Sequence, residues 1–359
     1  MHQDGSVNEA GFAFYDHLVD ALKEQGKKVF VTLYHWDLPQ YLEDEGGWLN
    51  RNTAVEFAKY CDAISARLGS KVDAYTTLNE PFCAGYLSYE LGIHAPGLTG
   101  KKNGRQASHH LLLAHGLAMQ VLRKNCPDAD LGIVINIHPG YPQTDSAADI
   151  EATKMGGEYL FYWYLDPLLK QCYPSVMDKL TDAEKPDIQD GDMAIIGQPL
   201  DFIGMNYYTR NVYTMDANGW FSIVPPPQGN LTEMGWEIVP GAMTDMLVSL
   251  HNEYTLPPMF ITENGAAMPD KLVGNQVHDQ DRIDYFQSHF LAVHNAMEQG
   301  VNIKGYFAWS LLDNFEWAEG YSKRFGLIYI DYETQERIWK DSAIAYKNML
   351  TSRALVTSE

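Results

Sequence analysis

The stretch "MFITENGAA" at residues 259–267 begins as a buried β-strand and ends on a carboxylate. Its apolar start runs to Glu263, and the Asn-Gly pair that follows is typical of a turn. The stretch "AYTTLNEP" at residues 74–81 repeats the pattern, because apolar and β-branched residues lead to Glu80 and a proline. Two strands that each end on a glutamate indicate two carboxylates at one edge of a sheet.

Strand-like runs alternate with amphipathic helical stretches along the chain. Strand–helix alternation predicts parallel strands covered by helices, in a barrel or a doubly wound sheet. The chain has no G-x-G-x-x-G or Walker sequence, which the doubly wound alternative usually carries. Polar residues at the ends of nearly all strands favour a TIM (β/α)8-type barrel, whose active site lies at that face. The predicted strands are 28–36, 74–80, 131–139, 201–209, 259–265 and 304–313, and the clearest helices are 10–26, 53–69, 107–125 and 281–300.

Composition narrows the classes of function. The chain has 359 residues, 45% of them hydrophobic, and a net charge of −21, which disfavours nucleic acid and anionic membranes as partners. We identify no membrane span and no signal peptide, so we expect a cytoplasmic protein. Four dispersed cysteines form no C-x-x-C pair, and the histidines in the 107–125 helix lack ligand-type partners. We therefore expect no metal and no cofactor.

Two carboxylates that flank a glycosidic bond can serve as acid/base and nucleophile. Glu80 could stay protonated in an apolar niche, whereas Glu263 could stay ionised if Tyr208 or another donor bonds it. The alternative is that each glutamate is a solvated residue at the rim of the sheet.

The motifs around these glutamates resemble those of glycoside hydrolase family 1, the β-glucosidase family. "TLNEP" and "ITENG" are similar to its two signature motifs, and further segments follow in the family's order over essentially the whole chain. These segments are "NEAGFAFYDHLVDAL", "TLYHWDLPQ", "GLAMQVLR", "DFIGMNYYTR", "GWEIVP", "WSLLDNFEWAEGYSKRFGLIYIDY" and "RIWKDSA". The resemblance implies a retaining β-glycosidase that hydrolyses terminal β-D-glucosyl residues by double displacement, with β-galactosyl and β-fucosyl residues as further substrates.

The resemblance also implies a role for each matching residue around the reacting centre. Glu80 matches the acid/base and Glu263 the nucleophile, so their carboxyl carbons should lie ~5–5.5 Å apart. Asn79 matches the residue that bonds the sugar 2-hydroxyl, and His35 matches a ligand of the 3-hydroxyl. Tyr208 matches the phenol that bonds the nucleophile, with the polar residue Asn206 nearby.

The remaining matches form the walls of the sugar pocket. Trp309 matches the platform under the sugar ring, and Glu316 and Trp317 match the residues that bond the outer hydroxyls. Phe325 lines the same pocket, and Trp236 matches a wall of the aglycone site. The expected partners are therefore small β-glucosides or cello-oligosaccharides. A carboxylate at Glu316 argues against 6-phosphorylated sugars, because it would repel the phosphate.

The family pattern also predicts a departure in this chain. The segment matching "VNEAG" begins at Val7, so about six of eight strand–helix units would be present, in one domain over residues 1–359. The resemblance implies that a glutamine, an arginine and a histidine of the site are lost with the other two units. A catalytically weak sugar-binding or regulatory remnant is thus the alternative function. An open barrel would also expose the strand edges near Val29 and Tyr306, which predicts a homo-oligomer through that side.

Overall fold

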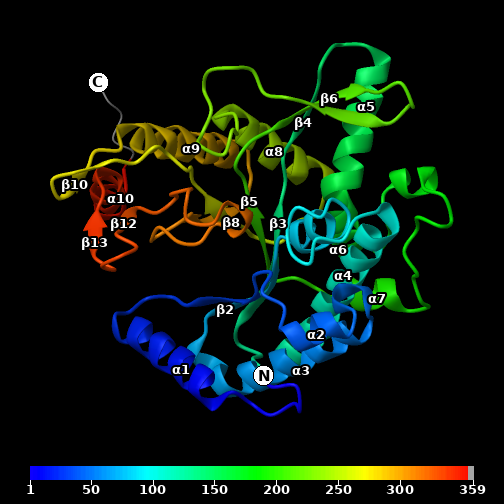
Figure 1. Cartoon of the computed structure of the whole chain (residues 1–359), viewed down its shortest axis with the longest axis horizontal. Coiled ribbons are helices and arrows are strands. Elements are labelled where there is room, and N and C mark those ends of the chain that lie inside the picture. Colours follow the sequence, from blue (N-terminus) through cyan, green and yellow to red (C-terminus); the bar gives the residue numbers. More distant parts are fainter. Residues whose placement is uncertain (355–359) are drawn as a thin grey trace. The chain divides into compact units, whose positions relative to one another are not determined.

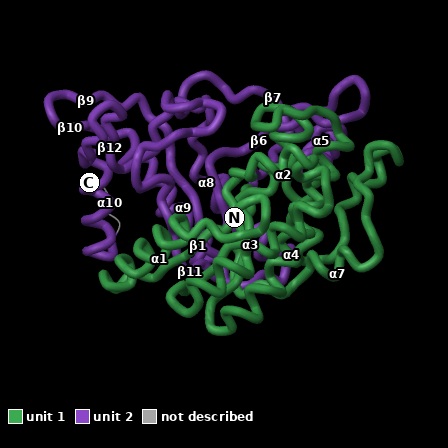
Figure 2. Tube along the Cα trace, turned by 60° about the horizontal axis from the view of Figure 1, so that its bottom comes forward, with its two compact units in different colours: residues 1–136, 158–204 green, residues 137–157, 205–359 purple. Residues whose placement is uncertain are grey.

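The computed structural model describes residues 1–354, which fall into two compact units (Figure 2). The first unit comprises residues 1–136 and 158–204, and the second comprises residues 137–157 and those from 205 onward. Each unit is described separately below. The prediction of a single barrel domain over 1–359 stays a prediction.

Parallel strands form the centre of the first unit. β1 (Phe30–Tyr34) pairs in parallel with β2 (Ala74–Asn79), and β2 pairs in parallel with β3 (Asp130–Asn136). Every residue of β2 is buried, as expected of a parallel strand with both faces covered. The next strand in the order is β5 (Phe202–Asn206), whose first three residues belong to this unit.

Helices lie beside these strands (Figure 1). α4 is the longest helix of this unit and has 16 buried residues. It packs against α3, whose C-terminus is followed by Gly69 at a positive φ of 52°. A glycine suits this position because it has no Cβ to clash in the left-handed region. The helices of this unit are α1 (Glu9–Glu24), α2 (Gln40–Asp44), α3 (Asn52–Leu68), α4 (Lys101–Asn125), α6 (Trp163–Leu169) and α7 (Asp192–Ile196). Short helical turns are η1 (Gly47–Leu49), η2 (Gly69–Lys71), η3 (Cys83–Leu87), η4 (Glu158–Tyr162) and η5 (Ser175–Lys179).

The second unit continues the parallel arrangement. β8 (Met259–Asn264) follows β5 in the strand order and pairs in parallel with β11 (Ile303–Ala308), the last strand. Gly305 of β11 lies against Phe260 of β8, where a Cβ would come within 2.8 Å of the ring. The helices of this unit are α5 (Ala147–Gly157), α8 (Pro240–Glu253), α9 (Gln280–Glu298) and α10 (Asp341–Ser352), with the short turn η6 (Trp317–Glu319).

Three small sheets in the second unit were not predicted. β4 (Gly140–Pro142) pairs in parallel with β6 (Asn211–Met215), which forms a hairpin with β7 (Phe221–Val224). The other two are hairpins, β9 (Leu272–Val273) with β10 (Gln276–Val277) and β12 (Ile328–Ile330) with β13 (Arg337–Trp339). Their strands have only two to five residues, too few for a periodicity to be recognised.

All six predicted parallel strands are confirmed, each shorter than the segment expected from the sequence. The four clearest predicted helices are confirmed as α1, α3, α4 and α9. No helix within residues 1–354 is long and apolar enough to cross a membrane. The two glutamates lie at strand ends as predicted, since Glu263 is near the end of β8 and Glu80 directly follows β2.

Candidate active site

The carboxylate of Glu80 is enclosed by the segment that follows β2. Glu80 is only 5% exposed and takes a positive φ of 44°, which turns the chain sharply away from the strand. Its backbone N–H donates to the carbonyl of Val134 in β3 at 3.0 Å, and the thiol of Cys83 donates to its Oε2 at 3.0 Å. The backbone of Glu80 is thus tied to the adjacent strand, and its carboxylate is bonded by the first turn after β2. Its protonation state stays a prediction.

Asn79 and His35 meet beside Glu80. The side-chain amide of Asn79 lies 3.2 Å from Nε2 of His35, and burial lowers the pKa of His35 to about 4. The imidazole is therefore neutral near pH 7, and its Nε2 can accept the amide proton. The indole N–H of Trp36 donates to the carbonyl of Asn79 at 2.8 Å. Sequence reasoning missed Trp36, although its place in "YHW" next to His35 was a usable signal.

In the second unit, Glu263 is paired with a phenol. The hydroxyl of Tyr208 donates to Oε2 of Glu263 at 2.7 Å, as the resemblance implied, and the glutamate is 8% exposed. The backbone N–H of Tyr207 donates to the carbonyl of Glu263 at 3.1 Å. Asn206 lies close by and accepts a 2.6 Å hydrogen bond from the hydroxyl of Thr262. This arrangement suits an ionised carboxylate, which accepts hydrogen bonds only.

Aromatic side chains gather around Tyr208. Its ring centroid lies 5.1 Å from Trp236 and 6.1 Å from Phe325, and Trp309 packs against the same cluster. The backbone N–H of Trp309 donates to the carbonyl of Asn264 at 2.9 Å. Four of the predicted pocket residues are therefore in one apolar cluster, next to the candidate nucleophile.

Asn264 supports this cluster, and no role was predicted for it. Its amide donates to the carbonyl of Tyr207 at 2.6 Å and to the hydroxyl of Tyr285 at 2.9 Å. Its side-chain oxygen accepts from Tyr306 at 2.5 Å. Burial raises the pKa values of Tyr285 and Tyr306, so both phenols are neutral donors or acceptors near pH 7. The fully buried Asn264 therefore links β8 to β11 and α9.

Glu316 and Trp317 lie in the loop that follows β11. Both are half-buried, and the backbone N–H of Glu316 donates to the carbonyl of Gly320 at 2.7 Å. The ring of Trp317 lies 6.4 Å from that of Phe315. Their contacts with sugar hydroxyls stay a prediction.

The buried histidines of α4 have structural partners. His109 lies between Asp192 and the hydroxyl of Tyr173, at 2.9 and 2.8 Å, and burial lowers its pKa. Across residues 1–354, no group of three or more His, Cys, Asp or Glu side chains is arranged to hold a metal ion.

Comparison with known proteins identifies the family. The model of glycosyl hydrolase family 1 matches residues 1–355. The chain belongs to glycosyl hydrolase family 1. Its similarity to solved members of the family indicates an α/β fold of the TIM-barrel type, and within residues 1–354 the large sheet has six strands.

Known relatives of this family 1 chain can be aligned with almost its whole length. A bifunctional beta-D-glucosidase/beta-D-fucosidase of Bifidobacterium breve is 43% identical over 98% of the chain and 81% of the relative. A beta-glucosidase of Agrobacterium sp. is 41% identical over 95% of the chain and 76% of the relative. The structure of a family 1 β-glucosidase from Thermotoga maritima has a TM-score of 0.94 and 40% identity, covering 98% of the chain and 80% of that protein. The predicted loss of two N-terminal units stays a prediction.

The predicted site residues of this family 1 member fall in both units. His35, Asn79 and Glu80 lie in the first, and the second holds Asn206, Tyr208, Trp236, Glu263, Trp309, Glu316, Trp317 and Phe325. Within each unit, the hydrogen bonds and ring contacts above bring most of these residues together. The separation of the two carboxyl groups stays a prediction.

Proposed function

We propose that the chain is a retaining β-glycosidase that hydrolyses terminal β-D-glucosyl residues of small β-glucosides and cello-oligosaccharides. The observation that carries this proposal is the 2.7 Å hydrogen bond between Tyr208 and Glu263 beside an aromatic cluster. An oriented, buried carboxylate is suited to attack the anomeric carbon of a sugar. Aromatic faces are suited to stack on the C–H face of a pyranose.

The mechanism follows from two carboxyl groups with different surroundings. Glu80 in its protonated form donates a proton to the glycosidic oxygen while Glu263 attacks the anomeric carbon, forming a covalent glycosyl-enzyme. The aglycone leaves as an alcohol. Glu80 then removes a proton from water, and the water attacks the same carbon and releases Glu263. Two inversions leave the product in the β configuration.

The substrate range draws support from the named relatives. Two of them are called β-glucosidases and one a β-glucosidase/β-fucosidase, which supports β-glucosides first and β-fucosides second. The alternative of a catalytically weak sugar-binding remnant gains no support from these names. Hydrolysis and sugar binding measured on one sample separate the two: binding of glucose without turnover would favour the remnant.

The deciding experiment combines stereochemistry with rescue. We expect release of 4-nitrophenol from 4-nitrophenyl β-D-glucoside, with β-glucose as the first sugar seen by NMR. Glu263→Ala should abolish turnover, and added azide should restore part of it and give α-glucosyl azide, because azide replaces the missing nucleophile. An α-configured first product from the unaltered enzyme would refute the double displacement.

Self-association is also proposed. Helix α1 exposes Phe14, Leu18 and Leu22, which share one face of the helix, together with Tyr15. Burying such a face against a second copy would be favourable at about 25 cal/mol per Å². Light scattering at moderate salt should give a mass above the 40.5 kDa of one chain. A monodisperse monomer would refute the oligomer.

A further inference from the structure

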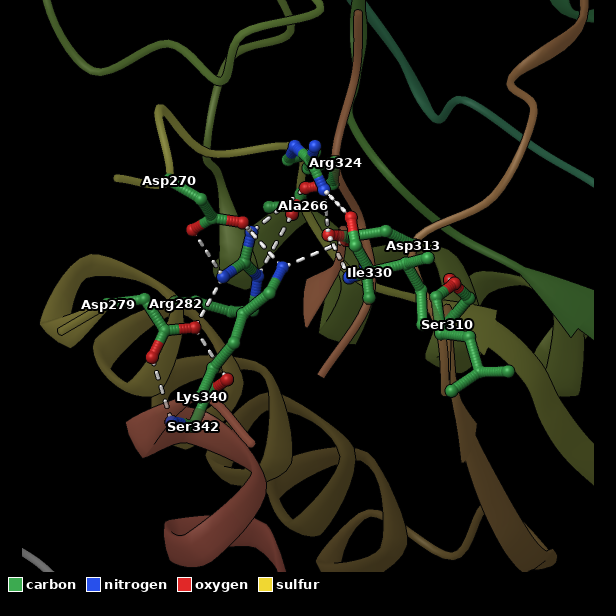
Figure 3. Close-up of polar contacts among 12 residues, drawn as sticks. Ala266, Asp270, Asp279, Arg282, Ser310, Asp313, Arg324, Ile330, Lys340 and Ser342 are labelled. Atoms are coloured by element: carbon green, nitrogen blue, oxygen red, sulfur yellow. Dashed lines mark hydrogen bonds and ion pairs between the residues drawn. The ribbon is translucent and has the colours of Figure 1, made fainter. Parts of the chain in front are cut away.

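The second unit also contains a buried network of charged side chains (Figure 3). It contains three carboxylates and three cations, so its formal charges cancel. The carboxylates are Asp270, Asp279 and Asp313, and the cations are Arg282, Arg324 and Lys340. Five of these side chains are at most 2% exposed, and Arg324 is 18% exposed. Charges this deeply buried need partners on every side.

Lys340 connects two of the carboxylates in this network. Its Nζ lies 2.5 Å from Asp270 and 2.9 Å from Asp313, and its side chain is fully buried (Figure 3). Asp270 lies in the loop after β8, the strand that ends with Glu263 and Asn264. Asp313 lies in the segment after β11 that begins with Trp309. A single ammonium group therefore joins the segment after the candidate nucleophile to the segment that carries the predicted sugar contacts.

Asp313 closes the base of the loop at residues 314–323, which contains Glu316 and Trp317. Its carboxylate accepts from Arg324 at 2.6 Å, from the backbone N–H of Gly326 at 2.9 Å and from Lys340. Backbone hydrogen bonds reinforce this base, because Ser310 and Phe325 pair at 3.2 Å and Leu327 and Ser310 at 2.8 Å. The two ends of the loop are thus held side by side, directly beside Trp309 and Phe325.

Arg282 anchors the other half of the network. Its guanidinium forms a bidentate pair with Asp270, with both N–O distances at 2.8 Å, and also pairs with Asp279. It further donates to the carbonyl of Arg324 at 2.9 Å. Asp279 accepts from the backbone N–H of Ser342 at 2.8 Å. The starts of α9 and α10 are therefore fixed to both segments that border the site.

We infer that Lys340 is a positioning residue for sugar recognition, which sets the 314–323 loop against the segment that follows the nucleophile strand. The inference rests on the proposed glycosidase function and deepens it. The ammonium group of Lys340 bonds Asp270 and Asp313. It acts on the 314–323 loop through Asp313. Burial lowers the pKa of Lys340, and its two carboxylate partners oppose that shift.

The test measures discrimination between sugars. Lys340→Met keeps the length of the side chain but leaves both carboxylates without their shared cation. A displaced loop should lose contacts to the outer hydroxyls. We therefore expect a raised KM for 4-nitrophenyl β-D-glucoside. We also expect kcat/KM for this glucoside, divided by kcat/KM for the corresponding xyloside, to fall about 2- to 10-fold, which corresponds to the loss of about one hydrogen bond. Xylose lacks the C6 hydroxymethyl group, so its hydrolysis depends less on the loop.

The matched control is Arg105→Met in the first unit. Arg105 is also fully buried and paired with a carboxylate, Glu90, at 3.0 Å. Both variants should unfold at lower temperature, but only Lys340→Met should change the sugar ratio. A loss of folded enzyme lowers the rate with both substrates equally and leaves the ratio unchanged. Lys340→Arg, which keeps the charge, should recover part of the discrimination.

Asp313→Asn provides a second variant if Lys340→Met does not fold. It keeps an oxygen that can accept from Gly326 but weakens the pairing with Arg324 and Lys340. An unchanged sugar ratio in a folded Lys340→Met or Asp313→Asn variant would overturn the inference. An inactive unaltered enzyme would instead overturn the proposed function, and the two failures are therefore distinguishable.

Discussion

The hydroxyl of Tyr208 and Oε2 of Glu263 are joined by a 2.7 Å hydrogen bond, and both side chains are buried. Tyr208 is two residues beyond the end of β5, and Glu263 is in β8. The bond therefore fixes the direction of the carboxylate from a neighbouring strand. Rotation of the glutamate side chain would have to break it.

Removing this phenol should slow the reaction. Tyr208→Phe frees Glu263 to rotate away from the line of attack, and we expect kcat/KM to fall about 10- to 100-fold, the range typical of a misplaced reacting group. The measurement is steady-state hydrolysis of 4-nitrophenyl β-D-glucoside. Tyr207→Phe is the matched control, because that buried phenol donates instead to the carbonyl of Val239 at 2.6 Å. Equal rates for the two variants would contradict the role of Tyr208.

The loss of hydrolysis rate in Glu80→Ala should depend on the leaving group of the substrate. A poor leaving group needs a proton from Glu80, whereas 2,4-dinitrophenolate leaves without one. We expect cellobiose hydrolysis to fall by about 100-fold or more and 2,4-dinitrophenyl β-glucoside to lose far less in the glycosylation step. An equal loss on both substrates in pre-steady-state measurements would show that Glu80 is not the acid.

Gly265→Ala should disturb the contact between β8 and Trp309. A Cβ at Gly265 would lie 1.8 Å from the carbonyl oxygen of Trp309, so the backbone must move. Overpacking of this kind costs about 1–3 kcal/mol, and it should also raise KM because Trp309 shifts. Thermal unfolding and KM are the measurements. Gly241→Ala in α8 is the control, since nothing lies within 4 Å of its Cβ position. It should leave KM unchanged.

Acid should destabilise the protein partly through His115. Burial lowers the pKa of His115 to about 3, and its Nδ1 lies 2.7 Å from the hydroxyl of Thr77. Since its pKa is lower in the folded than in the unfolded state, protonation favours unfolding once the pH falls below about 6.5. The loss is up to about 1.4 kcal/mol per pH unit until the pH reaches the folded value.

Urea unfolding at pH 7.0, 5.5 and 4.5 tests this expectation. His115→Gln should flatten the decline between pH 6.5 and 4.5, although it lowers stability at pH 7 by removing a packed ring. His17→Gln, at an exposed position on α1, is the control. The same slope in the parent and in His115→Gln would contradict the assignment.

Much of the parallel sheet could be predicted because its signals are local. An apolar run that ends on a polar residue marks β2 and β8 directly, and helix periodicity marks α1 and α3. The pairing of Tyr208 with Glu263 came from resemblance, because the two residues are 55 positions apart. Nothing in the local sequence specifies such a contact.

The charge network could not be predicted for the same reason. Lys340 and Asp313 are 27 positions apart, and Lys340 and Asp270 are 70 apart. An isolated lysine or aspartate in a sequence is more often solvated than buried. Only the arrangement of the loops after β8 and β11 shows that these charges are enclosed. The hydrogen bond from the thiol of Cys83 to Glu80 was also not predicted, because the spacing of cysteines indicates only disulfides and metal sites.

The closed base of the 314–323 loop has a consequence for engineering. Asp313 and Arg324 form an ion pair across that base. The two ends of the loop between them therefore stay adjacent when the residues within the loop are changed. Its exposed members include Phe315 and Tyr321, which are 50% and 58% exposed. Loops with fixed, adjacent ends tolerate replacement at little cost in chain entropy. Segments from other family members could therefore be exchanged here to alter sugar preference, without redesign of the strand that carries the nucleophile.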